Sequence, residues 1–389
     1  MFSNKSIQLD VLKKRAYNLR WATVPDGVIP LTAADPDFPV APEISDAICR
    51  FAKEGYFSYG PADGLPEFKE SMAEYFRSKR KIKAEPGFIF PVDSAAFGIA
   101  LICKAFLEVG DEAIIFDPVD FLFRYSIEAV GGIAIPFAIL PGTEDAGFEK
   151  MELLITRKTK LICLCNPLNP TGKVFTKKEL TDLAAIARKY DLIVLSDEIW
   201  SDITFSPNEF TSFASLDEDT SNRTVTVTGF SKAYGLAGLR IGAVMASNAR
   251  HYKMLLDASM HNSTIHGANI ISQVAASAAL DRCGYWLDAF LIHLHSMRSL
   301  CVNGLNSVNG FKCISPEGCY VAFADITGTN RTSSQIRDIL LNDAKVAVVP
   351  GLKEWFGGGA EGYIRLSFAT SAEILGDALD RIIKTANSL

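Results

Sequence analysis

The chain alternates short apolar runs with longer segments whose apolar residues recur at helical spacing. Between about residues 65 and 280, most of the apolar runs end at an acidic residue or at a turn-forming residue. Strands that are buried on both faces read as continuous apolar runs, so this alternation predicts a mostly parallel sheet with helices on both sides. We expect strands at residues 113–116, 160–165, 192–195 and 224–228, and helices at 67–80, 95–109 and 177–190.

A second, smaller layer is expected from the rest of the chain. Residues 286–303 read as one long helix, and the first fifty residues hold too few elements to fold alone. We therefore expect a large domain at 51–285 and a composite α+β small domain built from 1–50 and 286–389. Within the small domain we expect strands at 320–325 and 364–368, and helices at 333–341 and 372–386.

The composition of the chain limits the kinds of partner that it is expected to bind. The 389 residues carry a net charge of -6, which gives no basic field for nucleic acid. We expect no membrane partner, because no apolar run is long enough for a span and the start does not resemble a signal peptide. The eight cysteines contain no CxxC pair and no HExxH motif is present, so we expect reduced thiols, a cytoplasmic location and no metal site.

Three successive predicted strand ends carry polar residues. They are Asn169 in NPLNPTG, Asp197 in SDEIW and Lys232 in TGFSKAYGLAGLRIG. Ligands of open α/β sheets collect outside the carboxyl ends of the strands, so these side chains should meet in one crevice. Together they suit a cationic aromatic ring that bears an aldehyde: the lysine amine condenses with the aldehyde, the acid keeps the ring nitrogen protonated, and the amide binds a ring hydroxyl.

A phosphate group would have its own cradle. Ser94, Ala95 and Ala96 lie where a strand-like segment meets a helix, so their N–H groups and the positive helix end favour an anion. Arg240 can add a bidentate contact, and Ser231 offers a hydroxyl beside the lysine.

Late in the chain, Arg365 stands within the apolar segment YIRLSFA. A buried arginine needs an anionic partner, which is either a substrate carboxylate or an internal acid such as Glu361.

The segments NPTG, SDEI, SK followed by GLRIG, and RLSFA occur in the order and spacing of one family. On these motifs the whole chain resembles the class I/II aminotransferases, which are pyridoxal-phosphate (PLP) enzymes of fold type I. The resemblance implies an aspartate-aminotransferase-like fold, PLP as cofactor, and transfer of an amino group between an L-amino acid and a 2-keto acid. It also implies a homodimer with shared active sites.

The resemblance assigns roles to individual positions. Lys232 would form the Schiff base with PLP and shuttle the proton, Asp197 would bind the pyridine nitrogen, and Asn169 would contact the ring hydroxyl and line the substrate site. Arg240 would bind the phosphate, and Arg365 would bind the substrate α-carboxylate.

Further positions follow from the same resemblance. Tyr59 in YGPADGLPEF matches the tyrosine that reaches the phosphate across the dimer interface. Ala34 in LTAADPDF stands where a glycine backbone usually touches the carboxylate, and Trp200 takes the usual tyrosine position after the aspartate.

Some positions depart from the family pattern. Asp120 stands where an aromatic residue usually stacks on the pyridine ring, with Phe121 or Phe123 as substitutes, and Gly229 replaces a common phosphate-binding serine. The N-terminal segment and Asp202 look closer to the cystathionine β-lyase-like branch. A PLP-dependent carbon–sulfur β-lyase acting on cystathionine- or cysteine-like substrates is therefore the alternative function.

Two other classes of protein fit the sequence less well. The PLP-binding half of a transcription regulator would need a basic winged-helix segment, and a nucleotide-dependent dehydrogenase would need GxGxxG; both are absent from the sequence. Aspartate-specific members use a partner-subunit arginine near the position of Met260 and His261, where this chain has none, which disfavours a dicarboxylate substrate. His261, Asn262 and Thr264 would line the neighbouring subunit's site or pack in the interface.

Overall fold

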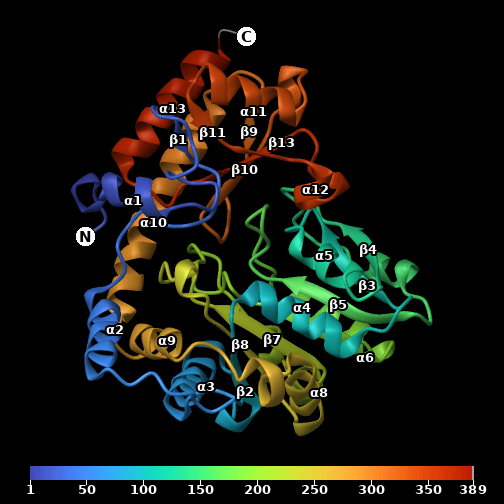
Figure 1. Cartoon of the computed structure of the whole chain (residues 1–389). Helices are drawn as coiled ribbons and strands as arrows, with labels where there is room; N and C mark the ends of the chain where they lie inside the picture. Colours follow the sequence, from blue (N-terminus) through green and yellow to red (C-terminus); the bar gives the residue numbers. More distant parts are fainter. Residues whose placement is uncertain (388–389) are drawn as a thin grey trace.

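The computed structural model describes residues 1–387, and its larger part is built on a seven-stranded sheet with the strand order β2-β8-β7-β6-β5-β3-β4 (Figure 1). Strand β8 runs antiparallel to both neighbours, β2 and β7, while β3 to β7 pair in parallel. The predicted mostly parallel sheet is confirmed. The strands are β2 (Ile89–Val92), β3 (Glu112–Asp117), β4 (Ile133–Ala138), β5 (Thr159–Cys165), β6 (Ile193–Asp197), β7 (Thr224–Gly229) and β8 (Gly242–Ala246).

The helices of this part begin and end at recognisable signals. Thr176 caps α6 with its hydroxyl oxygen, which accepts from the N–H of Glu179, and the Glu179 carboxylate accepts from Thr176 in return. Helix α4 ends at Phe106, three residues earlier than predicted, because Leu107 is already extended. The helices are α2 (Pro42–Glu54), α3 (Pro66–Arg80), α4 (Ala95–Phe106), α5 (Leu122–Glu128), α6 (Lys177–Lys189), α7 (Glu218–Asn222), α8 (Ala249–Ser259) and α9 (Ile270–Arg282).

The smaller part of the molecule, at the top of Figure 1, is built from both ends of the chain. Strand β1 pairs in parallel with β11, so that Ile29 lies opposite Val346, and a separate sheet has the order β12-β13-β10-β9. Its elements are α1 (Leu9–Arg15), β1 (Ile29–Pro30), α10 (Gly284–Asn306), β9 (Lys312–Cys313), β10 (Val321–Asp325), α11 (Ser333–Asn342), β11 (Val346–Ala347), β12 (Val349–Pro350), α12 (Lys353–Phe356), β13 (Tyr363–Ser367) and α13 (Ala372–Ala386). The domain boundaries stay a prediction, and α2 packs against α9 of the larger part. No helix within residues 1–387 combines the length and apolar character that a membrane crossing requires.

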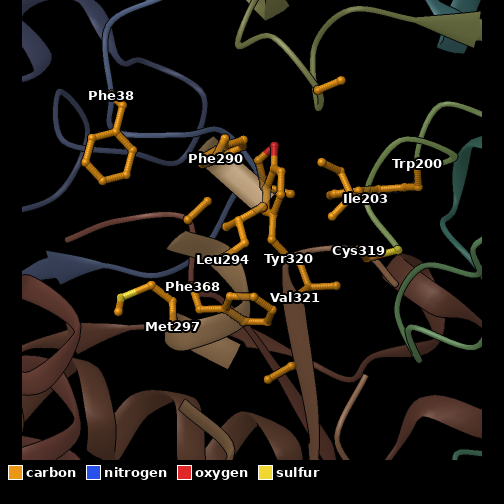
Figure 2. Close-up of a cluster of buried hydrophobic side chains, with 14 of the residues drawn as sticks. Phe38, Trp200, Ile203, Phe290, Leu294, Met297, Cys319, Tyr320, Val321 and Phe368 are labelled. Carbon is orange, nitrogen blue, oxygen red and sulfur yellow. The ribbon is translucent and has the colours of Figure 1, made fainter. Parts of the chain in front are cut away.

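A buried aromatic cluster joins the two parts beside the carboxyl ends of the large sheet. Figure 2 shows Tyr320 between Trp200, which follows β6, and Phe290 of α10. The Trp200 and Tyr320 rings meet edge to face with centroids 4.7 Å apart, and both side chains are almost fully buried. This contact fixes the loop after β6 against the small sheet.

A second connection lies where β3 ends. The N–H of Val119 donates to the carbonyl of Phe356 at 2.8 Å, and the N–H of Phe121 donates to the carbonyl of Trp355 at 2.9 Å. Helix α12 is thereby bonded to the loop that leads from β3 to α5.

Candidate active site

Lys232 lies just after β7, where three parts of the chain meet. Its Nζ donates to the carbonyl of Ala34 at 2.8 Å and lies 5.3 Å from the centroid of the Trp200 ring. The hydroxyl of Tyr320 donates to the same carbonyl at 3.1 Å. The lysine is therefore held between the N-terminal segment, the loop after β6 and β10.

The electrostatic surroundings of Lys232 favour a reactive amine. Burial lowers the pKa of Lys232, and the positive charge of Arg365 acts in the same direction. The carboxylates of Asp35 and Asp120 oppose this by raising the pKa of Lys232. The net direction is downward, so a larger share of the amine is unprotonated and nucleophilic near neutral pH than for an exposed lysine.

Asp197 ends β6 and is buried. Its Oδ1 accepts from the N–H of Ile199 at 3.1 Å, and within residues 1–387 its Oδ2 has no hydrogen-bond partner. Burial raises the pKa of Asp197 to about 7. A cationic ring nitrogen at Oδ2 would supply the missing opposite charge, so this residue fits the pyridine ring of PLP.

Arg365 on β13 points one edge of its guanidinium at Asn169. Its Nη1 donates to Oδ1 of Asn169 at 3.1 Å, its Nη2 donates to the carbonyl of Thr32 at 3.2 Å, and its buried Nε has no partner in the described chain. Glu361 is not its counter-ion, because no ion pair joins the two and the Glu361 carboxylate accepts from the N–H of Ser333. The guanidinium thus keeps a free donor for an anion.

The residues expected to cradle a phosphate lie at the start of α4. The Ser94 hydroxyl caps the helix by accepting from the N–H of Phe97 at 3.1 Å, and the first-turn N–H groups of Ala95 and Ala96 have no acceptor within residues 1–387. The sheet approaches this helix end closely, because a Cβ at Gly242 would lie 2.8 Å from the nitrogen of Ala95. These free donors fit a phosphate group.

The other residues predicted to bind the cofactor make few contacts with the site in the structure of one chain. Arg240 precedes β8, is exposed, and makes no ion pair among the described residues; Ser231 adjoins Lys232 in sequence and is partly buried. Tyr59 is 88 % exposed and contacts the ring of His266, with centroids 5.3 Å apart. None of the contacts within residues 1–387 joins Tyr59 to Lys232.

The substitutes proposed for the missing stacking ring face elsewhere. Phe123 is 1 % exposed and belongs to the core of the large sheet, and Phe121 packs edge-on against Trp355 and Tyr125. Asp120 itself lies in the site, where its Oδ2 accepts from Nδ2 of Asn169 at 2.9 Å.

Several residues of the site were missed in the sequence. Asp35 and Thr32 lie in the loop around Ala34, and Tyr320 precedes β10. Asp35 follows the candidate residue Ala34 and could have been predicted from that position. Nothing in the sequence around Tyr320 indicates a role in the site. Asp202, which suggested the lyase-like branch, forms an ion pair with the buried Arg80 and accepts from the Tyr75 hydroxyl at 2.9 Å.

Comparison with known proteins gives consistent matches along nearly the whole chain. A family model described as aminotransferase class I and II matches residues 26–382. Aspartate aminotransferase from Pyrococcus abyssi is 34% identical over 366 residues, covering 92% of this chain and 91% of the relative. The crystal structure of an aromatic aminotransferase from Pyrococcus horikoshii matches with a TM-score of 0.86 at 30% identity, covering 92% of this chain and 96% of that one.

A third match concerns the fold alone. Cystalysin from Treponema denticola, whose crystal structure contains a pyridoxal 5'-phosphate cofactor, matches with a TM-score of 0.90 at 23% identity, covering 100% of this chain and 99% of that one.

Proposed function

This chain belongs to the class I and II aminotransferases and is a PLP-dependent enzyme that moves an amino group between an amino acid and a keto acid, and from this premise we propose that Lys232 binds the cofactor and moves the substrate α-proton. The predicted aminotransferase activity, PLP cofactor and aspartate-aminotransferase-like fold are confirmed by the family match and the structural neighbours. When bound, PLP supplies an aldehyde for the amine and a cationic ring that withdraws electrons from the substrate α-carbon.

The observation that carries the proposal is the buried amine of Lys232, with its lowered pKa, between Ala34 and Trp200. An amine that is partly unprotonated can bond to a carbonyl and can also accept and return a proton. Its single hydrogen-bond partner in the described chain is the Ala34 carbonyl, which leaves the amine able to turn toward substrate.

Different residues around Lys232 would bind different parts of the cofactor. Asp197 would keep the ring nitrogen protonated through its free Oδ2, and Asn169 would bind the ring hydroxyl with its amide N–H. The N–H groups at the start of α4 would bind the phosphate, and the side chains of Ser94, Ser231 and Arg240 would complete the phosphate site.

Arg365 would bind the substrate α-carboxylate. Its unpartnered Nε and its fork geometry suit a carboxylate, and the backbone of Ala34 with the amide of Asn169 would border the same position. Trp200 would close the site on the side of Lys232.

We propose amino acids with a single carboxylate as substrates. The P. abyssi relative is named for aspartate, which carries two carboxylates. In this chain, however, two acids, Asp35 and Asp120, act on Lys232 in the site together with the cation Arg365. Asp35 and Asp120 would repel a second substrate carboxylate, and Arg365 would already hold the α-carboxylate. An amino-donor screen with pyruvate, 2-oxoglutarate and oxaloacetate as acceptors tests this, and a clear preference for aspartate or glutamate as donor would contradict it.

We propose a cytoplasmic homodimer. The aromatic side chains of Tyr56, Phe57 and Tyr59 are exposed together, beside a hollow of about 280 Å³ that residues 265–271 also line. A second copy on this face would bury these rings, and the family resemblance assigns Tyr59 to the partner's phosphate site. All eight cysteines are free thiols, which supports a reducing compartment. An active monomer in size-exclusion chromatography would contradict the dimer.

The test of Lys232 is chemical labelling. Borohydride reduction of the purified enzyme should bleach its visible absorption and leave the cofactor attached to Lys232, as found by peptide mass spectrometry. Lys232→Ala should lose both the label and turnover, while Lys178→Ala, which changes an exposed lysine of α6, should keep both. Label on another lysine would refute the assignment. Release of pyruvate and sulfide from cysteine without an added keto acid would favour the β-lyase alternative.

A further inference from the structure

Asp120 lies inside the site and is bonded to it on three sides. Its Oδ2 accepts from Nδ2 of Asn169 at 2.9 Å, and its Oδ1 accepts from the N–H of Leu122 at 3.2 Å. Its own N–H donates to the carbonyl of Asn169 at 3.2 Å. Since Asn169 accepts from Arg365 at 3.1 Å, the three side chains form a continuous series of carboxylate, amide and guanidinium.

This series allows only one orientation of the Asn169 amide. A guanidinium only donates, and an ionised carboxylate only accepts. If the amide of Asn169 were flipped, its NH₂ group would face the N–H of Arg365 and its oxygen would face the oxygen of Asp120, so both bonds would be lost. An aromatic residue at position 120 would leave the amide held from the Arg365 side alone.

The charge of Asp120 is supported by its neighbours. Burial is the largest effect and leaves the pKa of Asp120 above its usual value. Arg365 opposes burial most strongly, followed by the N–H of Leu122 and by Lys232. The other titratable groups that face it are Asp197 at the end of β6 and Cys165 at the end of β5. Both oxygens of Asp120 accept hydrogen bonds, as expected of an ionised carboxylate.

We propose that Asp120 is a positioning residue: it fixes the Asn169 amide and thereby keeps the Arg365 guanidinium aimed at the substrate carboxylate before substrate arrives. The proposal rests on the function assigned above to Arg365. The second N–H of Asn169 stays free for the cofactor, so one acid orients a group that serves both the cofactor and the substrate.

The test separates the orienting role from the charge. Asp120→Asn keeps the shape but replaces an acceptor by an amide that can itself flip. Acetate, a carboxylate that cannot react, is titrated into the PLP-loaded enzyme and its binding is followed by the cofactor absorption. We expect acetate to bind about tenfold more weakly and the KM for the amino acid to rise by a similar factor, with a smaller fall in kcat.

Three variants make the result specific. In an Asn169→Ala background, Asp120→Asn should have little further effect, because Asp120 acts through Asn169. Asp120→Glu keeps an anionic acceptor and should restore part of the acetate affinity. Asp117→Asn makes the same charge change at the end of β3, three residues before Asp120, where the carboxylate accepts from the N–H of Gly359, and should match the wild type.

The opposite results are equally clear. Acetate that binds Asp120→Asn as tightly as wild type, or more tightly, would show that Asp120 acts only as a repelling charge and would overturn the proposal. So would a full tenfold effect in the Asn169→Ala background. A wild-type protein that neither binds PLP nor transaminates would instead refute the proposed function, whatever the variants do.

Discussion

Adding one methyl group at Gly242 should separate the large sheet from the start of α4. The Cβ of an alanine at this position would lie 2.8 Å from the nitrogen of Ala95, 2.8 Å from the carbonyl oxygen of Thr228 and 2.9 Å from the carbonyl carbon of Ser94. All three are backbone atoms, so no flexible side chain can give way. Opening the first contact to 3.4 Å requires a shift of 0.6 Å between the helix end and β8.

The expected cost follows from this shift. Inserting a methyl group into a closely packed site typically destabilises a protein by about 1–3 kcal/mol. The same displacement moves the free N–H groups of Ala95 and Ala96 relative to the rest of the cofactor site. A tenfold loss of affinity corresponds to about 1.4 kcal/mol, so a cost of this size at the phosphate site would weaken PLP binding to Gly242→Ala by about 5- to 150-fold.

The assay compares two glycine substitutions in the same segment. Gly238→Ala is the control, because a Cβ there would meet nothing within 4 Å and its φ is not positive. Urea unfolding of the cofactor-free proteins gives the stability change, and titration of PLP followed by absorbance gives the affinity. If Gly242→Ala bound PLP as tightly as Gly238→Ala, helix α4 would not be the phosphate cradle and the reasoning would fail.

Two further predictions concern buried charges. Arg80→Met should lower the free energy of unfolding by about 3–5 kcal/mol in urea, because it leaves Asp202, whose side chain is only 17% exposed, without its cation. Arg77→Met on the same helix, whose ion pairs are exposed, should cost less than about 1 kcal/mol, and equal losses would contradict this. For Asp197, a folded pKa of about 7 against an unfolded value near 3.8 means that the cofactor-free folded chain binds the proton more tightly, so its stability should fall as the pH rises from about 4 to 7. Asp197→Asn should lose less stability than wild type between pH 5 and pH 7 in urea unfolding, and parallel losses would argue against the raised pKa.

The sequence alone predicted the strands and helices whose positions depend on local patterns of residues. The apolar runs ending at Cys165 and Asp197 predicted β5 and β6, and Thr176 predicted the start of α6. Because parallel strands end at the same edge, the convergence of Asn169, Asp197 and Lys232 at this edge could also be expected before any coordinates.

What the sequence could not give depends on contacts between distant segments. Tyr320 reaches the Ala34 carbonyl across 286 positions of the chain, and no local pattern reports such a pairing. The reversed direction of β8 was not foreseen, since an apolar run carries no sign of its direction. Asp120 was noticed as a departure from the family, but its bond to Asn169 was visible only once β3 and β5 were placed side by side.

The pairing of β1 with β11 has a consequence for the order in which the newly made protein can fold. The whole seven-stranded sheet lies between residues 89 and 246, so it can form while the ribosome is still adding the last third of the chain. Residues 29 and 30 must wait for residues 346 and 347, and until then the apolar side chains of Trp21, Leu31 and Phe38 lack the C-terminal surface that buries them. The segment around β1 is therefore made before the seven-stranded sheet but can pack only after it, and a chaperone would have most apolar surface to bind during this interval.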